Sequence, residues 1–121
     1  MQYGPINEFE RIMAVDVFMP ELFKLFGKSK QELKKYLVFL NAQLNKIDNR
    51  ETIINREEPI NYKEINLYSI RKPMKKNTRV LYYYMQNDKI ILLTAFDEKN
   101  ESDYENGKRR AYNRLKSLNI I

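Results

Sequence analysis

The sequence predicts a small α+β domain, and three observations lead to this prediction. Its 121 residues are enough for one domain with a modest core, and a composition of 43% hydrophobic and 31% charged residues is that of an ordinary globular protein. A first half with helical periodicity is followed by a second half with runs of Val, Ile and Tyr. We therefore expect residues 1–121 to form a single domain, with residues 1–10 as a short N-terminal extension.

The first half of the chain predicts one strand and two helices. Residues 11–18 are rich in apolar side chains and favour a strand, with a helix starting at Pro5 as the alternative. Pro20 suits the first turn of a short helix that Gly27 would end. A longer helix follows, because Ser29 stands three residues before a glutamate, which is the spacing of a capping box. Its apolar face repeats every three or four residues: Leu33, Tyr36, Leu37, Leu40, Leu44 and Ile47. We expect the two helices to form a helical hairpin that covers one face of a sheet.

The second half predicts a sheet followed by a helix. Residues 48–61 are polar and predict a connecting loop. Three strands are expected after it: 65–71, 79–86 and 89–96. Asn87 and Asp88 tolerate tight-turn dihedral angles, so the last two strands predict an antiparallel hairpin. The final helix is expected over residues 102–118, where Ser102 begins a second capping box.

The composition excludes several kinds of chemistry and location. Without Cys or His there is no disulfide, thiolate nucleophile or histidine ligand, so any catalysis must use Lys, Arg, Tyr or carboxylates. No apolar run approaches the roughly 20 residues that span a bilayer, and the N-terminus lacks the pattern of a secretory signal. We therefore expect a cytoplasmic protein that does not bind membranes.

The excess positive charge lies in the second half of the chain. Residues 1–61 contain nine basic and nine acidic side chains, whereas residues 62–121 contain thirteen and seven, which accounts for the net charge of +6. Such a surface attracts polyanions through counterion release, or is covered by an acidic protein partner. A basic face kept only for solubility is the alternative.

Five cations with no acid among them form the first candidate site: Arg71, Lys72, Lys75, Lys76 and Arg79. The planar guanidinium of arginine can hold a phosphate at two points, and lysine holds it as a point charge, so the cluster suits phosphate binding. Arg71 and Arg79 stand at the ends of expected strands, where a sheet would fix their direction. A solvated turn has the same composition.

A second candidate site follows the last expected strand. In an antiparallel hairpin the end of that strand lies beside Arg79, so Lys99 and Arg79 could flank one phosphate. Arg110 and Arg114 follow on the last helix, toward solvent or the border of its apolar stripe. Tyr82–Tyr84 are interpreted as core and cross-strand contacts in preference to a base-stacking platform. The nearby acids are interpreted as dipole and capping partners, with no metal site: Asp97, Glu98, Asp103 and Glu105.

The order of these features resembles the phage-derived, HigB-like branch of the RelE/ParE toxin superfamily. That branch has a leucine-arginine step, a short basic loop, an arginine that opens a strand, an aliphatic hairpin that ends in phenylalanine with lysines after it, and a terminal helix with an A-x-x-R step. The matching residues are Ile70-Arg71, Arg79-Val80-Leu81-Tyr82, Ile90 to Phe96, Lys99 and Ala111-Tyr112-Asn113-Arg114. The likeness covers roughly the last half of the chain well, and the first half by architecture.

The resemblance implies a small RelE-like fold, with an antiparallel-rich twisted sheet, an N-terminal helical hairpin and a C-terminal helix. It also implies the toxin of a type II toxin–antitoxin pair, typically an endoribonuclease that cuts mRNA at the ribosomal A site without a metal or other cofactor. Arg71 and Arg79 are then expected to stabilise the transition state, and Lys99 to transfer a proton or hold phosphate. The implied partners are an antitoxin, the ribosome and mRNA, with RNA held by further cations: Lys72, Lys75, Lys76, Arg110 and Arg114.

Two departures from the family pattern keep other functions open. The paired lysines after the phenylalanine are Glu98 and Lys99 here, beside Asp97, and the Thr-Pro step that usually follows is absent. The first alternative is a non-catalytic binding protein, either one that blocks a target such as gyrase or an inactive relic kept for complex formation. The second is a phage-encoded nucleic-acid-binding protein.

Overall fold

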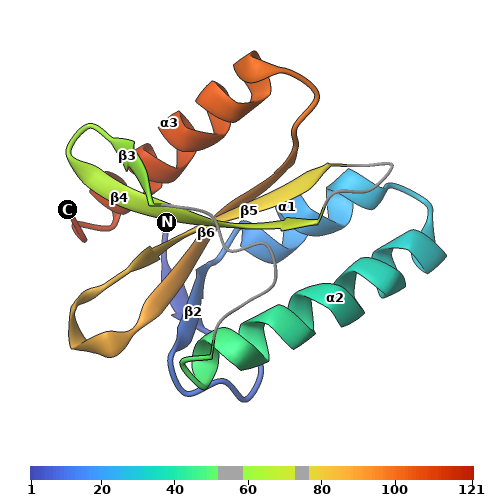
Figure 1. The fold of residues 1–121 in the computed structure, drawn as a ribbon, viewed down its shortest axis with the longest axis horizontal. Coiled ribbons are helices and arrows are strands. Elements are labelled where there is room, and N and C mark those ends of the chain that lie inside the picture. The colour runs from blue at the N-terminus through green and yellow to red at the C-terminus, as the bar shows by residue number, and fades with distance from the viewer. Residues whose placement is uncertain (52–58, 73–76) are drawn as a thin grey trace.

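The structure, a computed structural model, describes residues 1–51, 59–72 and 77–121. Within these ranges, three helices and six strands form an α+β fold, as the sequence predicts (Figure 1). The elements are β1 (Tyr3–Pro5), β2 (Ile12–Val15), α1 (Phe18–Phe26), α2 (Lys30–Asp48), β3 (Ile60–Tyr62), β4 (Ile65–Lys72), β5 (Thr78–Tyr84), the short 3-10 turn η1 (Gln86–Asp88), β6 (Ile90–Asp97) and α3 (Glu101–Ser117). No helix in these ranges has the length and apolar character needed to cross a membrane.

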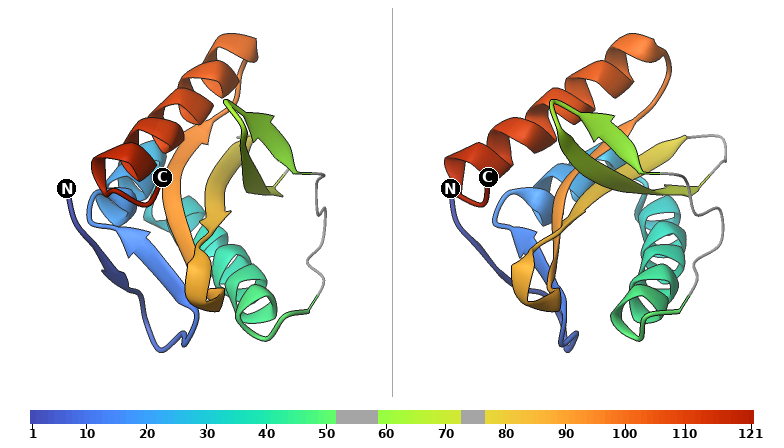
Figure 2. Two further views of the ribbon diagram at one scale, coloured as in Figure 1. Left: turned by 90° about the vertical axis from the view of Figure 1, so that its left-hand side faces the viewer. Right: turned by 60° about the vertical axis from the view of Figure 1, so that its left-hand side comes forward.

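The strands form one mixed sheet in the order β1-β2-β6-β5-β4-β3. β2 runs parallel to β6, and the other neighbouring pairs are antiparallel. Figure 2 shows the sheet between α3 on one side and α2 on the other. The two faces of the sheet are therefore covered by helices from opposite ends of the chain.

The helical hairpin forms because its local signals are strong. The side chain of Ser29 accepts a hydrogen bond from the Glu32 amide and caps α2, as the capping-box spacing predicts. Gly27 ends α1 with φ of 54°, a left-handed conformation that glycine adopts without strain. One stripe of α2 is buried: Tyr36, Leu40, Gln43, Leu44 and Ile47.

The β5–β6 hairpin provides the centre of the core. Asn87 and Asp88 have φ of 70° and 61°, the positive values that a tight turn needs. The pairing places Arg79 opposite Phe96, and so brings the start of β5 to the end of β6. The aliphatic residues of β6 are fully buried: Ile90, Ile91, Leu92 and Leu93. Tyr82 and Tyr84 pack against Tyr68 of β4, which confirms the prediction of cross-strand contacts.

Several local predictions are wrong. Residues 3–5 belong to β1, so the N-terminal segment is part of the sheet and no helix starts at Pro5. β3 begins inside the segment 48–61 that was expected to be a loop, and residues 52–58 lie outside the described residues. Lys63 and Glu64 form the β3–β4 turn with positive φ, although neither is a favoured residue there. Ser102 does not cap α3, because it lies within the helix. The cap is Asn100, which has an extended backbone and whose side chain accepts a hydrogen bond from the Asp103 amide.

Candidate functional site

Two arginines of the first predicted cluster lie directly opposite each other. Arg71 of β4 pairs with Arg79 of β5, and residues paired in this way project to the same side of a sheet. That side faces α3, because the guanidinium carbon of Arg79 lies 4.4 Å from the centre of the Tyr104 ring. The structure therefore brings together the two predicted arginines beneath the C-terminal helix.

Arg79 is a buried arginine held by several elements. The residue is only 4% exposed. Its Nη1 donates to Oγ of Ser69 at 3.1 Å, and its Nη2 donates to Oε2 of Glu98 at 2.9 Å. The Tyr104 ring supplies a cation–π contact. These contacts fix the direction of the guanidinium and occupy the nitrogens that a phosphate would need.

A chain of hydrogen bonds connects the two arginines through Asn77 and Glu98. Arg71 Nε donates to Asn77 Oδ1 at 3.1 Å, and Asn77 Nδ2 donates to Glu98 Oε2 at 3.0 Å. The backbone amide of Glu98 also donates to the Asn77 carbonyl at 2.9 Å. The Glu98 side chain keeps 17% of its surface exposed. The Glu98 carboxylate thus contacts the Arg79 guanidinium directly and is linked to that of Arg71 through Asn77, and it is partly accessible to water.

The lysines of the predicted site lie in different places. Lys99 follows Glu98 at the exit of β6 and is exposed, while its backbone amide donates to Asp103 Oδ2 at 2.9 Å. Lys72 points to the opposite face of the sheet, where its Nζ lies 5.1 Å from the centre of the Phe39 ring of α2. It does not share the site of Arg71, because neighbouring residues of a strand project to opposite faces. Lys75 and Lys76 lie outside the described residues.

Arg110 and Arg114 form a separate network with Glu21 of α1. Arg114 Nη2 lies 2.8 Å from Glu21 Oε2, and Arg114 Nη1 donates to the Leu93 carbonyl at 2.7 Å. The Arg114 side chain is only 13% exposed, so it lies at the border of the buried stripe and anchors α3. Arg110 is the more open of the two, with 34% of its side chain exposed, and its Nε donates to Thr94 Oγ1 at 2.8 Å.

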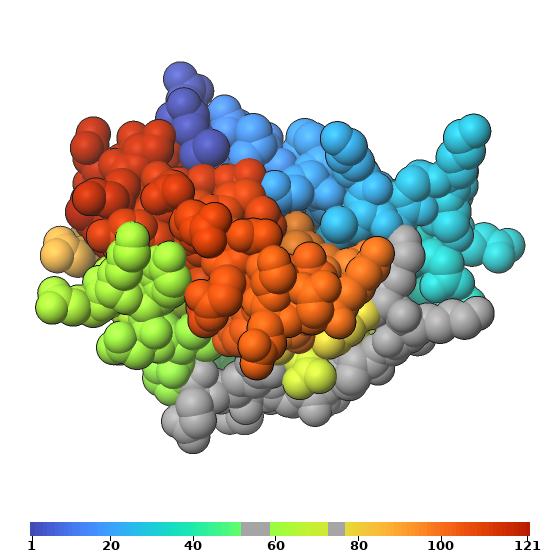
Figure 3. All heavy atoms as spheres, turned by 90° about the horizontal axis from the view of Figure 1, so that it is seen from above, coloured from blue at the N-terminus to red at the C-terminus, as the bar shows by residue number. Residues whose placement is uncertain are grey.

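Charge and burial act on this network together. Burial by itself would raise the pKa of Glu21, but hydrogen bonds from Arg114, Thr94 and the Ala95 amide outweigh it and lower that pKa. Burial lowers the pKa of Arg110, and the neighbouring charge of Arg114 adds to the decrease, while Glu21 opposes it. An open basic cavity of about 580 Å³ lies beside this network. It is lined by Met1 and by residues of α3: Asn106, Arg109, Arg110, Asn113, Arg114 and Ser117. Figure 3 shows the N-terminal residues against the C-terminal half of α3 on this face.

The acidic residues after β6 have different roles from one another. Asp103 accepts from the Lys99 amide, and Asp97 accepts from the Thr78 hydroxyl, so both are structural partners. Asp97 and Glu98 both contact β5 and not a helix end, contrary to the prediction, and Glu98 pairs with Arg79. The signal for this was the β5–β6 register, which brings the residue after Asp97 beside Asn77. Across the described ranges no three metal-binding side chains gather as a possible ion site.

The site joins a buried, oriented cation to a carboxylate and to more exposed cations. Such a group of side chains can bind a phosphodiester and transfer protons around it. Comparisons with protein-family models, curated proteins and solved structures give no match to this chain. The function is therefore inferred from the sequence and from the geometry of the site.

Proposed function

We propose that this chain is the toxin of a type II toxin–antitoxin pair, similar to the RelE/ParE superfamily, and that it cleaves ribosome-bound mRNA without a metal. The observation that carries the proposal is the pairing of Arg71 and Arg79 on the face of the sheet beneath α3, linked through Asn77 to Glu98. The α+β fold, with a helical hairpin before an antiparallel-rich sheet and a helix after it, also supports it.

In the proposed reaction each group has one role. Glu98 takes the proton of an RNA 2′-hydroxyl, and the 2′-oxygen attacks the adjacent phosphorus. Arg71, which is partly exposed, stabilises the charge that develops on the phosphoryl oxygens. Lys99 gives a proton to the departing 5′-oxygen. The products are a 2′,3′-cyclic phosphate and a 5′-hydroxyl end, and Glu98 and Lys99 then exchange protons with water.

Arg79 has a different role from the one expected from the sequence. Its two terminal nitrogens contact Ser69 and Glu98, and it is 4% exposed, so it acts as a positioning residue that holds the Glu98 carboxylate. Of the two α3 arginines expected to hold RNA, Arg110 is the more accessible, with 34% of its side chain exposed against 13% for Arg114.

The test adds the purified chain to a reconstituted translation reaction and maps mRNA ends by primer extension. Cuts within ribosome-occupied codons are expected for the wild type. Arg71→Ala should slow cleavage by about 100-fold or more, as loss of a transition-state donor does in other enzymes. Lys116→Ala, an exposed lysine of α3, is the matched control and should cleave normally. Intact mRNA with unimpaired translation would overturn the proposal.

The burial of Arg79 favours a second candidate, a binding protein without catalytic activity. Glu98 neutralises the Arg79 guanidinium inside the fold, and the fold needs this pair because a buried charge without a partner is destabilising. This candidate predicts growth arrest or tight complex formation with intact transcripts. A target of the gyrase type would appear as DNA damage in cells that express the chain, with no new mRNA ends.

A further inference from the structure

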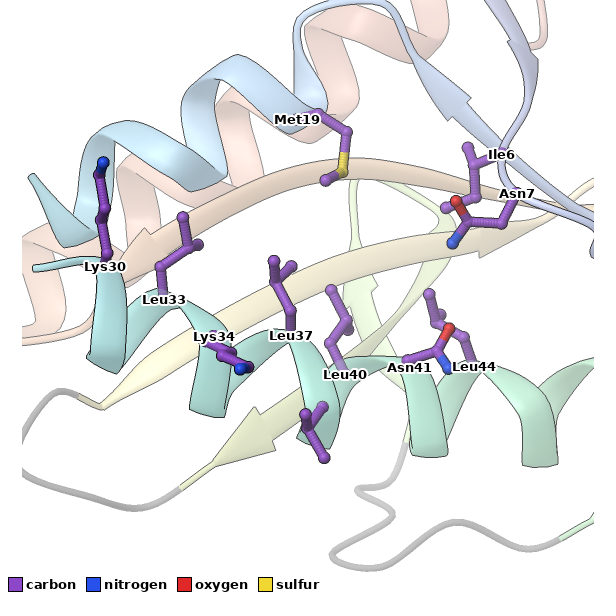
Figure 4. Close-up of a pocket in the computed structure, with 11 residues that line it drawn as sticks. Ile6, Asn7, Met19, Lys30, Leu33, Lys34, Leu37, Leu40, Asn41 and Leu44 are labelled. Carbon is purple, nitrogen blue, oxygen red and sulfur yellow. The ribbon is translucent and has the colours of Figure 1, made fainter.

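A groove on the opposite side of the molecule lies apart from the proposed site. It encloses about 490 Å³ between one edge of α2, the start of α1 and the loop after β1. Figure 4 shows α2 as one wall, with Met19 and Ile6 facing it from the other side. The lining residues are Ile6, Asn7, Met19, Lys30, Leu33, Lys34, Leu37, Val38, Leu40, Asn41 and Leu44.

The apolar surface of the groove exceeds what the core requires. Leu40 and Leu44 are nearly fully buried and form its base. Leu33 and Leu37 are only partly buried, and Val38 is 67% exposed. Leu33, Leu37 and Val38 make a second apolar stripe on α2, beside the buried stripe that contains Leu40 and Leu44. A continuous apolar strip of this kind marks a binding surface more often than a scattered exposed side chain does.

The charge around the groove has one sign. Lys30 and Lys34 line it, and Lys35 and Val38 line the adjoining hollow. The residues that line the groove include no acidic side chain. Asn7 and Asn41 lie toward the end away from Lys30 (Figure 4). The groove therefore combines an apolar base with a cationic rim at one end and amide groups at the other.

We propose that this groove binds an amphipathic, acidic helix of a partner protein. The lining residues of α2 run from Lys30 to Leu44, which is about 21 Å of helix at 1.5 Å per residue. A partner helix of about 15 residues matches that length, with apolar side chains at i, i+3, i+4 and i+7 entering the groove. Glutamates beside them would meet Lys30 and Lys34. The proposal does not depend on RNA cleavage, because Arg71, Arg79 and Glu98 lie on the face that α3 covers.

The test measures binding of a synthetic helical peptide to the full chain by fluorescence anisotropy. The peptide has about 15 residues, three leucines spaced four and three residues apart, and glutamates flanking them. Two control peptides replace the leucines with serine or the glutamates with lysine. The protein variants are Val38→Asp and Lys34→Glu, both at exposed positions that leave the core intact, and Lys116→Glu on α3 as the matched control.

Binding of the acidic peptide, and not of either control, is the expected result. Val38→Asp and Lys34→Glu should each weaken binding of the acidic peptide by about tenfold, and Lys116→Glu should leave it unchanged. The Lys34→Glu protein should also bind the lysine peptide better than the wild type does. Absence of binding, or equal binding of the serine peptide, overturns the proposal. A chain that sediments as a dimer and becomes monomeric with Val38→Asp also overturns it, since a second copy would then occupy the groove.

Discussion

Replacing Glu98 tests the stability of the site and its chemistry separately. Glu98→Ala removes the carboxylate that accepts from Arg79 at 2.9 Å and from Asn77 at 3.0 Å. Loss of one partner from a fully buried ion pair costs about 3–5 kcal/mol. Because the Glu98 side chain is 17% exposed, water replaces part of the interaction, and we expect a loss of about 2–3 kcal/mol. Glu98→Gln keeps an acceptor oxygen and should lose about 1 kcal/mol.

Urea unfolding followed by circular dichroism measures these differences. The double variant Glu98→Ala with Arg79→Leu should be less destabilised than the sum of the single variants, by about 1–3 kcal/mol, because the two side chains interact directly. A Glu98→Ala protein within about 0.5 kcal/mol of the wild type, near the precision of such comparisons, would refute the reasoning about this ion pair.

The Glu98→Gln variant tests the proposed role of Glu98 in cleavage. If Glu98 is the base, Glu98→Gln folds normally but slows mRNA cleavage by about 100-fold or more. Cleavage that stays constant or increases in Glu98→Gln would exclude that role. An increase would indicate in addition that the carboxylate restrains Arg79.

Three further predictions concern the stability of the fold. Gly107→Ala should destabilise the chain by about 1–2 kcal/mol in urea unfolding. The new Cβ would lie 2.3 Å from Phe96 Cε1, and the cost of this overpacking exceeds the gain in helix propensity. Asn106→Ala, at the preceding exposed position, is the control and should be neutral or stabilising. Arg11→Met should cost about 2–4 kcal/mol in the same assay, because Arg11 is 8% exposed and donates to the carbonyls of Ile47 and Asp88. Arg50→Met is the control: it breaks an exposed ion pair with Asp88 and should cost less than about 0.5 kcal/mol. The pKa of Glu21 is lowered in the folded protein, so this carboxylate stabilises the fold fully above its ordinary pKa of 4.5, and the stabilisation is lost as the pH falls through the lower folded pKa. Glu21→Gln should therefore flatten the dependence of the unfolding free energy on pH in the acid range. An unchanged slope would contradict this.

The elements predicted well are those with strong local signals. The capping box at Ser29 and the turn at Asn87-Asp88 both operate as the sequence indicates. β1 and β3 were missed because each has three residues, too few for an alternating pattern. Their position depends on pairing with β2 and β4, which is a tertiary contact. Asn100 was missed as a cap because Ser102 has the same chemistry two residues later.

The site was predicted in part. The run of cations between two expected strands grouped Arg71 with Arg79, and the structure pairs them across β4 and β5; the predicted hairpin concerned Arg79 and Lys99. The alternation of side chains along β4 was a signal that Lys72 faces away from Arg71. The pairing of Glu98 with Arg79 depends on the β5–β6 register, which places Glu98 beside Asn77, and the local pattern of acids before a helix does not reveal this tertiary contact. The same holds for Glu21, which lies 93 residues before its partner Arg114.

Glu21 also protects an open sheet edge. β2 pairs only with Ile90–Leu92, so the rest of the outer edge of β6 has no neighbouring strand among the described residues. There the Glu21 carboxylate accepts from the Ala95 amide, and Arg114 donates to the Leu93 carbonyl. An ion pair thus satisfies the backbone groups to which another chain would otherwise bind as an added strand. The Glu21–Arg114 pair is therefore a barrier to aggregation, at the edge of the most apolar strand in the protein.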